Sequence, residues 1–145
     1  MLEVEVFGAE LATAPPALAE VRRLCGEAAA SAGIHAGHLA IEFVDEERIT
    51  ELNAVHRARP EPTDVLSFPI DGVEPIGEIE RGARAGESSA LLVRELGDIV
   101  ICPAHTTDLR EAVVHGMLHL LGMDHEVDHG EMLALQRQLL SRGGR

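Results

Sequence analysis

The chain is poor in aromatic residues, with no tryptophan, no tyrosine and three phenylalanines among its 145 residues. Proteins that bind single strands of nucleic acid without sequence preference stack the bases on aromatic side chains, so that mode of binding is excluded. Cysteine is also scarce, because only Cys25 and Cys102 are present and no C-x-x-C pair occurs. A disulfide framework is therefore excluded. Cys102 lies in an apolar run, where a buried and unreactive thiol is expected.

Lysine is absent, and acidic residues outnumber basic ones. All 12 basic residues are arginine, against 25 acidic residues, which gives a formal net charge of −13. This balance argues against a polyanionic partner over most of the surface, so any contact with nucleic acid must be local and built from arginine. No run of 18 uncharged apolar residues occurs, and the N-terminus has no basic start. We therefore expect a cytoplasmic protein with no membrane partner.

The length predicts a single domain over residues 1–145, large enough to bury a core without disulfides or a metal. Period-two alternation and short apolar runs predict four strands, at Leu2 to Phe7, Leu39 to Val44, Asp64 to Ile70 and Leu96 to Cys102. Helical spacing predicts four helices, from Pro15 to Ser31, from Glu46 to Arg57 after a cap at Asp45, from a cap at Thr106 or Thr107 to Gly122, and from about His129 to Leu140. The stretch from Asp71 to Glu95 is expected to be a long loop.

This order of elements predicts a mixed α+β fold. Helical crossovers favour parallel neighbours and a hairpin requires an antiparallel pair, so we expect a small, mostly parallel sheet of about four strands. The third and fourth strands are candidates for the antiparallel pair, and the helices should cover the sheet. On the second helix, we expect Ile49, Leu52 and Val55 to face inward; on the first, Leu18 and Val21 begin the apolar stripe.

Residues His115 to His125 read HGMLHLLGMDH, which is the most informative motif of the chain. His115 and His119 are four residues apart, so a helix presents both imidazoles on one face. Gly122 follows an apolar run, where a left-handed glycine ends a helix and can bring His125 back as a third ligand. A single histidine on such a helix is usually a surface residue, but three at this spacing indicate a metal site on the helix and its following turn.

Three histidines with no fourth protein ligand suit a catalytic zinc, one per chain. A structural zinc is the alternative, and Asp124, Asp128, His129 or Cys102 would then be the fourth ligand. The string also approaches the H-E-x-x-H-x-x-G-x-x-H of the metzincin proteases, but Gly116 replaces the glutamate that serves as general base. A glycine inside a helix is unfavourable, so Gly116 either leaves space for a substrate or permits close helix packing.

Three motifs together resemble the YbeY family of bacterial single-strand-specific endoribonucleases, also called rRNA maturation factors. The first is HGMLHLLGMDH; the second joins Leu52-Asn53 and Arg57 to PTDVLSFP at Pro62 to Pro69; the third is LGDI at Leu96 to Ile99. The resemblance implies that Arg57 contacts phosphoryl oxygens, with Arg59 as a weaker candidate. It implies RNA as the substrate and ribosomal or small-subunit proteins as partners.

Some positions depart from the family pattern or carry further candidates. His56 stands where tyrosine is usual and Gln136 where glutamate is usual, and neither is expected to touch the metal motif. Asp98 or Asp124 is a candidate for orienting a ligand histidine, since such histidines often donate their second nitrogen to a carboxylate. The roles left open for four further polar residues are capping, turn formation and substrate contact. These residues are Asp64, Ser67, Asn53 and Thr63.

The first functional hypothesis is a zinc-dependent, single-strand-specific endoribonuclease in rRNA processing. The resemblance implies maturation of the 16S rRNA 3′ end and late 70S ribosome quality control as its setting. The second hypothesis is a non-catalytic ribosome-assembly protein with a structural zinc. The third is a small zinc metalloprotease, which the glycine at position 116 disfavours.

Overall fold

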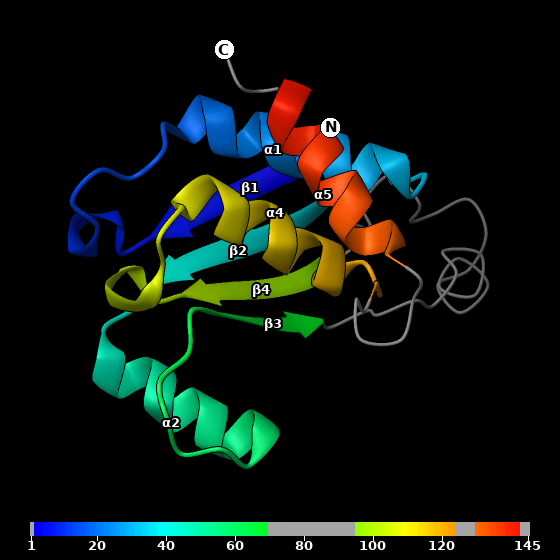
Figure 1. The fold of residues 1–145 in the computed structure, drawn as a ribbon. Helices are drawn as coiled ribbons and strands as arrows, with labels where there is room; N and C mark the ends of the chain where they lie inside the picture. Colours follow the sequence, from blue (N-terminus) through cyan, green and yellow to red (C-terminus); the bar gives the residue numbers. More distant parts are fainter. Residues whose placement is uncertain (1, 70–94, 124–129, 143–145) are drawn as a thin grey trace, which may run out of the picture.

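The computed structural model describes residues 2–69, 95–123 and 130–142 of the chain. Within them, four strands form one sheet in the order β1-β2-β4-β3 (Figure 1). β1, β2 and β4 run parallel, and β3 pairs antiparallel with β4. The strands are β1 (Leu2–Phe7), β2 (Gly37–Phe43), β3 (Val65–Pro69) and β4 (Glu95–Ile101). The predicted α+β fold, with a mostly parallel sheet and one antiparallel strand, is confirmed.

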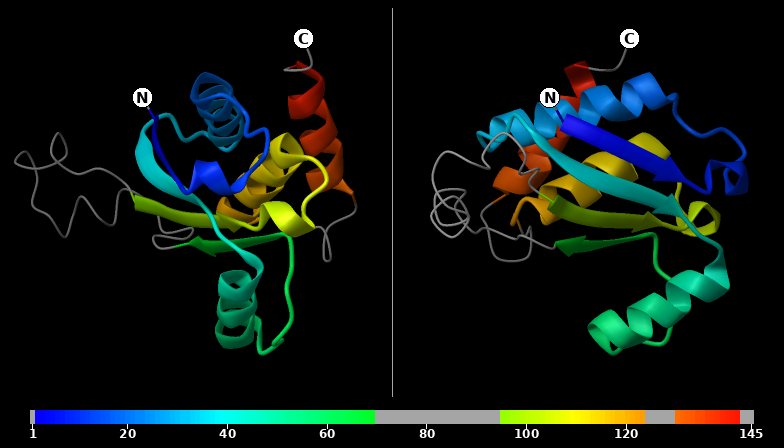
Figure 2. Two further views of the ribbon diagram at one scale, coloured as in Figure 1. Left: turned by 90° about the vertical axis from the view of Figure 1, so that its left-hand side faces the viewer. Right: turned by 180° about the vertical axis from the view of Figure 1, so that it is seen from behind.

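Three helices cover one face of the sheet: α1 (Leu18–Ser31), α4 (Leu109–Leu120) and α5 (Glu131–Arg142). The left view of Figure 2 shows these helices on one side of the strands, and the right view, from behind, shows the strands in front of them. Strand alternation sends Leu39, Ile41 and Ile99 into this layer, where they are fully buried against residues such as Leu24 and Met117. The main core therefore lies between the sheet and α1, α4 and α5.

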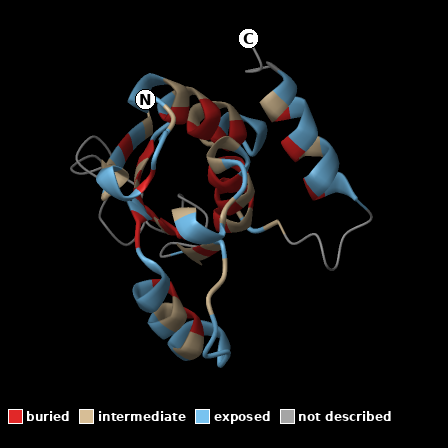
Figure 3. Cartoon of the chain, turned by 60° about the vertical axis from the view of Figure 1, so that its left-hand side comes forward, coloured by how far each residue is buried: buried red, intermediate tan, exposed pale blue. Residues whose placement is uncertain are grey.

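The fourth α-helix of the described residues, α2 (Glu46–Arg57), lies on the other side of the sheet and buries a smaller cluster. Asp45 caps it as predicted, its carboxylate accepting the backbone N–H of Arg48 at 2.8 Å. Ile49 packs with Leu66 and Val100 in this cluster. Figure 3 shows that α2 is mainly exposed, in contrast to the buried sides of α1 and α4.

The inward orientation expected for Val55 is wrong, because this side chain is 88% exposed. An α-helix advances about 100° per residue, so each step of three residues falls about 60° short of a full turn. Two such steps from Ile49 carry Val55 away from the sheet, whereas Asn53, four residues after Ile49, is buried. Leu18, the first residue of α1, is likewise 44% exposed.

Several helix starts differ from their predicted positions. α1 begins at Leu18, after the two prolines, and α5 begins at Glu131, while the expected start at His129 lies outside the described residues. α4 is capped by Asp108 and not by Thr106 or Thr107, because a 3-10 turn, η2 (Pro103–His105), occupies the preceding segment. A further 3-10 turn, η1 (Ala9–Leu11), follows β1. Most of the expected loop, residues 70–94, also lies outside the described part.

Both cysteines are buried and unpaired with each other. Burial raises the pKa of the Cys25 thiol to about 12, and it also raises the pKa of Cys102. The expectation that Cys102 is buried is confirmed, and its raised pKa disfavours the reactive thiolate. Across the described ranges, no helix has the length and apolar character that crossing a membrane requires.

Candidate metal centre

His115 and His119 lie one turn apart in the second half of α4, on the face away from the deepest part of the core. Their ring centroids are 4.7 Å apart and the ring planes meet at 77°. Both side chains are half-buried, whereas their neighbours Gly116 and Leu118 are buried. α4 therefore presents two imidazoles side by side at the boundary between core and solvent.

The end of α4 follows the predicted glycine-terminated pattern. Gly122 has a φ of 99°, a left-handed conformation that glycine adopts without steric cost. Its N–H donates to the carbonyl of His119 at 2.9 Å, and the N–H of Met123 donates to the carbonyl of Leu118 at 3.0 Å. These two bonds form a Schellman motif, which satisfies the last carbonyls of the helix and turns the chain back toward it.

The rest of the predicted ligand set lies outside the described residues. This applies to His125, Asp124, Asp128 and His129, so the third ligand stays a prediction. Within residues 2–69, 95–123 and 130–142, no three His, Cys, Asp or Glu side chains gather around one point where a metal would fit. Cys102 belongs to the cluster beneath α2, on the other side of the sheet from the histidines. It is therefore not placed to be a fourth ligand.

Gln136 of α5 contacts His115 directly. The ring Nδ1 and the side-chain Oε1 of Gln136 are 2.8 Å apart, and the amide nitrogen of Gln136 donates to Glu111 at 3.5 Å. With Oε1 as the acceptor, this contact places the proton on Nδ1, and a neutral ring then has its lone pair on Nε2. That is the form in which imidazole binds zinc, so this donor set fits a metal ligand. The expectation that position 136 does not touch the motif is wrong.

Gly116 is required for close packing of α4 on the sheet. A Cβ at this position would lie 2.6 Å from Cγ2 of Ile99 and 3.1 Å from Cγ2 of Val65. The room above the glycine is filled by these side chains, so the proposal that it leaves space for a substrate is wrong. The hydroxyl of Ser67 donates to the carbonyl of Gly116 at 2.7 Å. This hydrogen bond therefore links β3 to the turn of α4 that carries the histidines.

His115 also lines a cleft of about 260 Å³ between α4, α5 and the start of β3. Asp64 lies at its rim, where its carboxylate accepts the N–H of Val65 at 2.8 Å and the hydroxyl of Thr63 at 3.3 Å. The role of Asp64 seen here is to shape the entry to β3. Glu111 and Asp108 also line the cleft, so its wall is acidic.

Asp98 does not share the side of the sheet that α4 covers. It pairs with Phe68 across β3 and β4, and both Phe68 and the next alternate residue, Val100, pack with the cluster beneath α2. Its neighbour Ile99 is the one that faces α4. Strand alternation thus directs Asp98 away from the histidines.

The arginine candidates lie at the far end of α2. Arg57 and Arg59 are exposed. Asn53 is 3% exposed, and its side-chain amide nitrogen donates to the carbonyl of Glu61 at 2.9 Å while its backbone carbonyl accepts the N–H of Arg59 at 3.3 Å. Asn53 therefore folds the segment after α2 back onto the helix. His56 contacts Phe68, with ring centroids 4.4 Å apart.

The structure separates the arginines from the histidines. Figures 1 and 2 show α2 on one side of the edge strand β3 and α4 on the other. Sequence reasoning also missed Glu111 as a neighbour of Gln136 and of the cleft that His115 lines. The signal was present, because Glu111, His115 and His119 are spaced by four residues and share one helical face.

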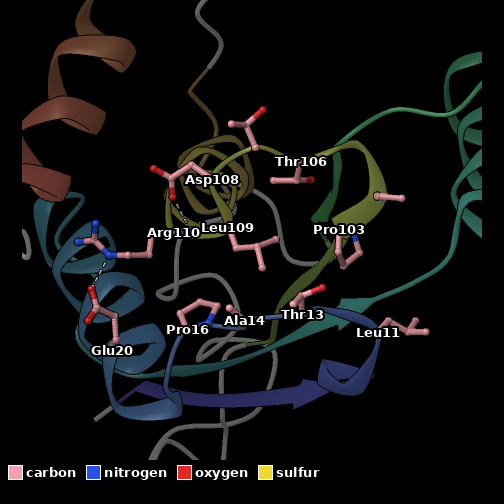
Figure 4. Close-up of a pocket in the computed structure, with 12 residues that line it drawn as sticks. Leu11, Thr13, Ala14, Pro16, Glu20, Pro103, Thr106, Asp108, Leu109 and Arg110 are labelled. Atoms are coloured by element: carbon pink, nitrogen blue, oxygen red, sulfur yellow. Dashed lines mark hydrogen bonds and ion pairs between the residues drawn. The ribbon is translucent and has the colours of Figure 1, made fainter.

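A second, larger cavity of about 760 Å³ lies at the carboxyl ends of β1 and β4 (Figure 4). Its walls come from the start of α1 and the start of α4. The Arg110 guanidinium donates to Glu20 at 2.6 Å, and this hydrogen bond is the main reason that the pKa of Glu20 is lowered. The cavity contains none of the residues that the sequence analysis assigned to the site.

Comparison with known proteins identifies the family. The family model described as endoribonuclease YbeY matches residues 16–144. The chain belongs to this family. Its sequence is 35% identical over 139 residues to the endoribonuclease YbeY of Bacillus cytotoxicus, covering 86% of this chain and 85% of that protein. It is 39% identical over 117 residues to the corresponding protein of Renibacterium salmoninarum, covering 71% and 69%.

A solved structure supports the fold. The solution structure of a Thermotoga maritima protein aligns with a TM-score of 0.51 over 95% of this chain and 87% of the other. The sequence identity is 23%, so this likeness bears on the fold alone. The three sequence motifs predicted membership of the YbeY family, and this prediction is confirmed.

Proposed function

We propose that this chain is a zinc-dependent endoribonuclease that cleaves single-stranded regions of ribosomal RNA. Membership of the endoribonuclease YbeY family supports an RNA-cleaving role in rRNA processing. The observation that carries the metal is the pair of adjacent imidazoles on α4, one of which has its Nδ1 2.8 Å from the amide oxygen of Gln136. Two such rings, completed by His125, would give three nitrogen ligands and an open position, as in catalytic zinc sites.

The chemistry divides between the two sides of β3. A bound zinc ion supplies positive charge that polarises the phosphodiester. His115, His119 and His125 would hold this ion, and Arg57 would pair with phosphoryl oxygens because its guanidinium is permanently charged and forms parallel hydrogen bonds. The acidic wall of the 260 Å³ cleft disfavours phosphate there. The RNA backbone would therefore approach from the arginine side.

This division supports a preference for single strands. A substrate that contacts both the end of α2 and the histidines of α4 must bend around the edge strand β3. A nucleic-acid duplex resists sharp bending over such short distances, whereas a single strand does not. The separation of the two groups therefore selects for a flexible chain.

The cellular setting follows from the family and the charge. We propose maturation of the 16S rRNA 3′ end and late 70S quality control as the processes involved. A net charge of −13 repels free RNA at low salt, so recruitment by a ribosomal or small-subunit protein would supply much of the affinity. We expect weak, salt-sensitive binding to naked RNA, and tight binding to arbitrary free RNA would contradict this setting.

Zinc content and cleavage of a single-stranded RNA should be measured together on matched variants. We expect about one zinc per wild-type chain. His119→Ala should lose both zinc and cleavage, whereas Arg57→Ala should keep zinc and lose cleavage. His35→Ala and Arg48→Ala are the controls, because both residues are exposed and lie outside the proposed site.

Three outcomes would overturn the proposal. Variants at His115 and His119 that lose zinc but cleave RNA at the wild-type rate would show that the metal is not catalytic. Unfolding on chelation, without metal-dependent cleavage in the loaded protein, would favour a structural zinc. Cleavage of a casein substrate in place of RNA would favour the metalloprotease.

A further inference from the structure

Gln136 is a buried polar residue of α5 that contacts His115, and its contacts assign it a role. We infer that Gln136, held in place by Glu111, fixes the proton of His115 on Nδ1 and so presents Nε2 to the metal. Gln136 acts through His115 and is a positioning residue. This inference rests on the proposed function, because it takes His115 to be a ligand of the metal.

The two contacts of Gln136 fix the orientation of its amide. Oε1 lies 2.8 Å from Nδ1 of His115, and Nε2 lies 3.5 Å from a carboxylate oxygen of Glu111. The carboxylate accepts hydrogen bonds and does not donate them when ionised. A flipped amide would set its oxygen against this carboxylate, two acceptors facing each other. Glu111 therefore keeps the amide oxygen directed at the ring, and the ring nitrogen there must be the one that carries a proton.

The position of Gln136 within α5 shows that it is there for its contacts and not for packing. It lies on the buried stripe of the helix, four residues after Met132 and three before Leu139, both of which are fully buried. Gln136 itself is only 7% exposed. An amide in such a stripe is unfavourable unless it is hydrogen-bonded, and an apolar residue would pack better. Its oxygen and nitrogen are each engaged by α4, which removes that cost.

The same geometry explains why α5 matters to the site. Docking of Met132 and Leu139 in the core sets where the amide lies, and the amide sets the ring plane of His115. Groups that orient a ligand histidine usually change metal affinity by about 10- to 100-fold when they are removed. The order Glu111, Gln136, His115 is a chain of donors and acceptors that ends at the ring.

The first test replaces the amide with an apolar side chain of similar length. Gln136→Met should lose the preference for a proton on Nδ1 of His115, which ring-nitrogen NMR of the metal-free protein reports. Its zinc affinity, measured by competition with a chelator, should fall by about 10- to 100-fold. Gln138→Met is the matched control, because Gln138 is exposed on the same helix, and it should change neither quantity.

The second test exchanges the two partners. Gln136→Glu alone keeps an acceptor for Nδ1 of His115 but places two carboxylates side by side, so it should keep the proton position and weaken docking of α5. The double variant Glu111→Gln, Gln136→Glu restores the order of donors and acceptors, so it should recover the docking of α5, followed by exchange of its amides with solvent deuterium, with the proton still on Nδ1. Urea unfolding of each variant is the control that tests whether the fold is retained.

The outcomes separate this inference from the proposed function. If Gln136→Met keeps both the proton on Nδ1 and the wild-type zinc affinity, the role of Gln136 is wrong. A double variant in which α5 docks no better than in Gln136→Glu would also overturn it. A wild-type chain with the expected proton position but no zinc binding would instead overturn the proposed function.

Discussion

Gly116 offers the sharpest test of how α4 is seated on the sheet. Gly116→Ala would put a Cβ 2.6 Å from Cγ2 of Ile99 and 3.1 Å from Cγ2 of Val65. Both neighbours are β-branched, so neither can swing its methyl group aside at low cost. Overpacking of this kind costs about 1–3 kcal/mol, whereas alanine gains about 1 kcal/mol over glycine in a helix. We therefore expect a net loss in the free energy of unfolding of up to about 2 kcal/mol.

Gly26→Ala is the matched control, because Gly26 lies inside α1 and a Cβ there meets nothing within 4 Å. It should gain about 1 kcal/mol from helix propensity alone. Both variants share that gain, so the difference between them, about 1–3 kcal/mol, measures the clash. Urea unfolding, with unchanged m-values, gives both free energies. A Gly116→Ala protein as stable as Gly26→Ala would refute the packing described for α4.

Three further predictions concern stability. His38 lies between Glu95 and Glu5, with ring-to-carboxylate distances of 2.9 Å, and these contacts, that of Glu95 foremost, raise its pKa. A histidine whose pKa is raised by folding stabilises the fold fully below its unfolded pKa of about 6.5, and this contribution is lost as pH rises through the folded value. His38→Gln should therefore lower the free energy of unfolding by about 0.5–1 kcal/mol at pH 5.5 and by little at pH 9. An equal loss at both pH values would contradict this. Ser67→Ala removes the hydrogen bond to α4 and should cost about 1 kcal/mol in urea unfolding, so an unchanged midpoint would argue against that contact. Asp108→Ala removes the cap of α4 and should cost about 0.5–2 kcal/mol, and a thermal midpoint equal to wild type would assign the cap elsewhere.

Local patterns predicted the fold where local physics decides it. The alternation of Leu2 to Phe7 became β1 with the same bounds, and Asp45 capped a helix over Glu46–Arg57 as expected. In both cases the signal lies within a few residues of the structure it specifies, through side-chain period or a cap hydrogen bond. The glycine end of α4 at Gly122 belongs to the same class.

Contacts between distant elements were beyond reach of such patterns. The role of Gly116 depends on Ile99 and Val65, which lie on two strands of the sheet. Gln136 contacts a ring 21 residues earlier in the chain, and the helical period places it on a buried stripe without naming its partner. Strand alternation directs Asp98 away from α4. To predict this, one would have to know which face of the sheet α4 covers.

The contact between α5 and His115 couples metal binding thermodynamically to the docking of α5. If docking of α5 raises the metal affinity by some factor, bound metal must raise the equilibrium constant for docking of α5 by the same factor. Exchange of the α5 amides with solvent deuterium would then slow on adding zinc. Truncation of the chain before Glu131 would weaken metal binding although it removes none of the three proposed histidine ligands.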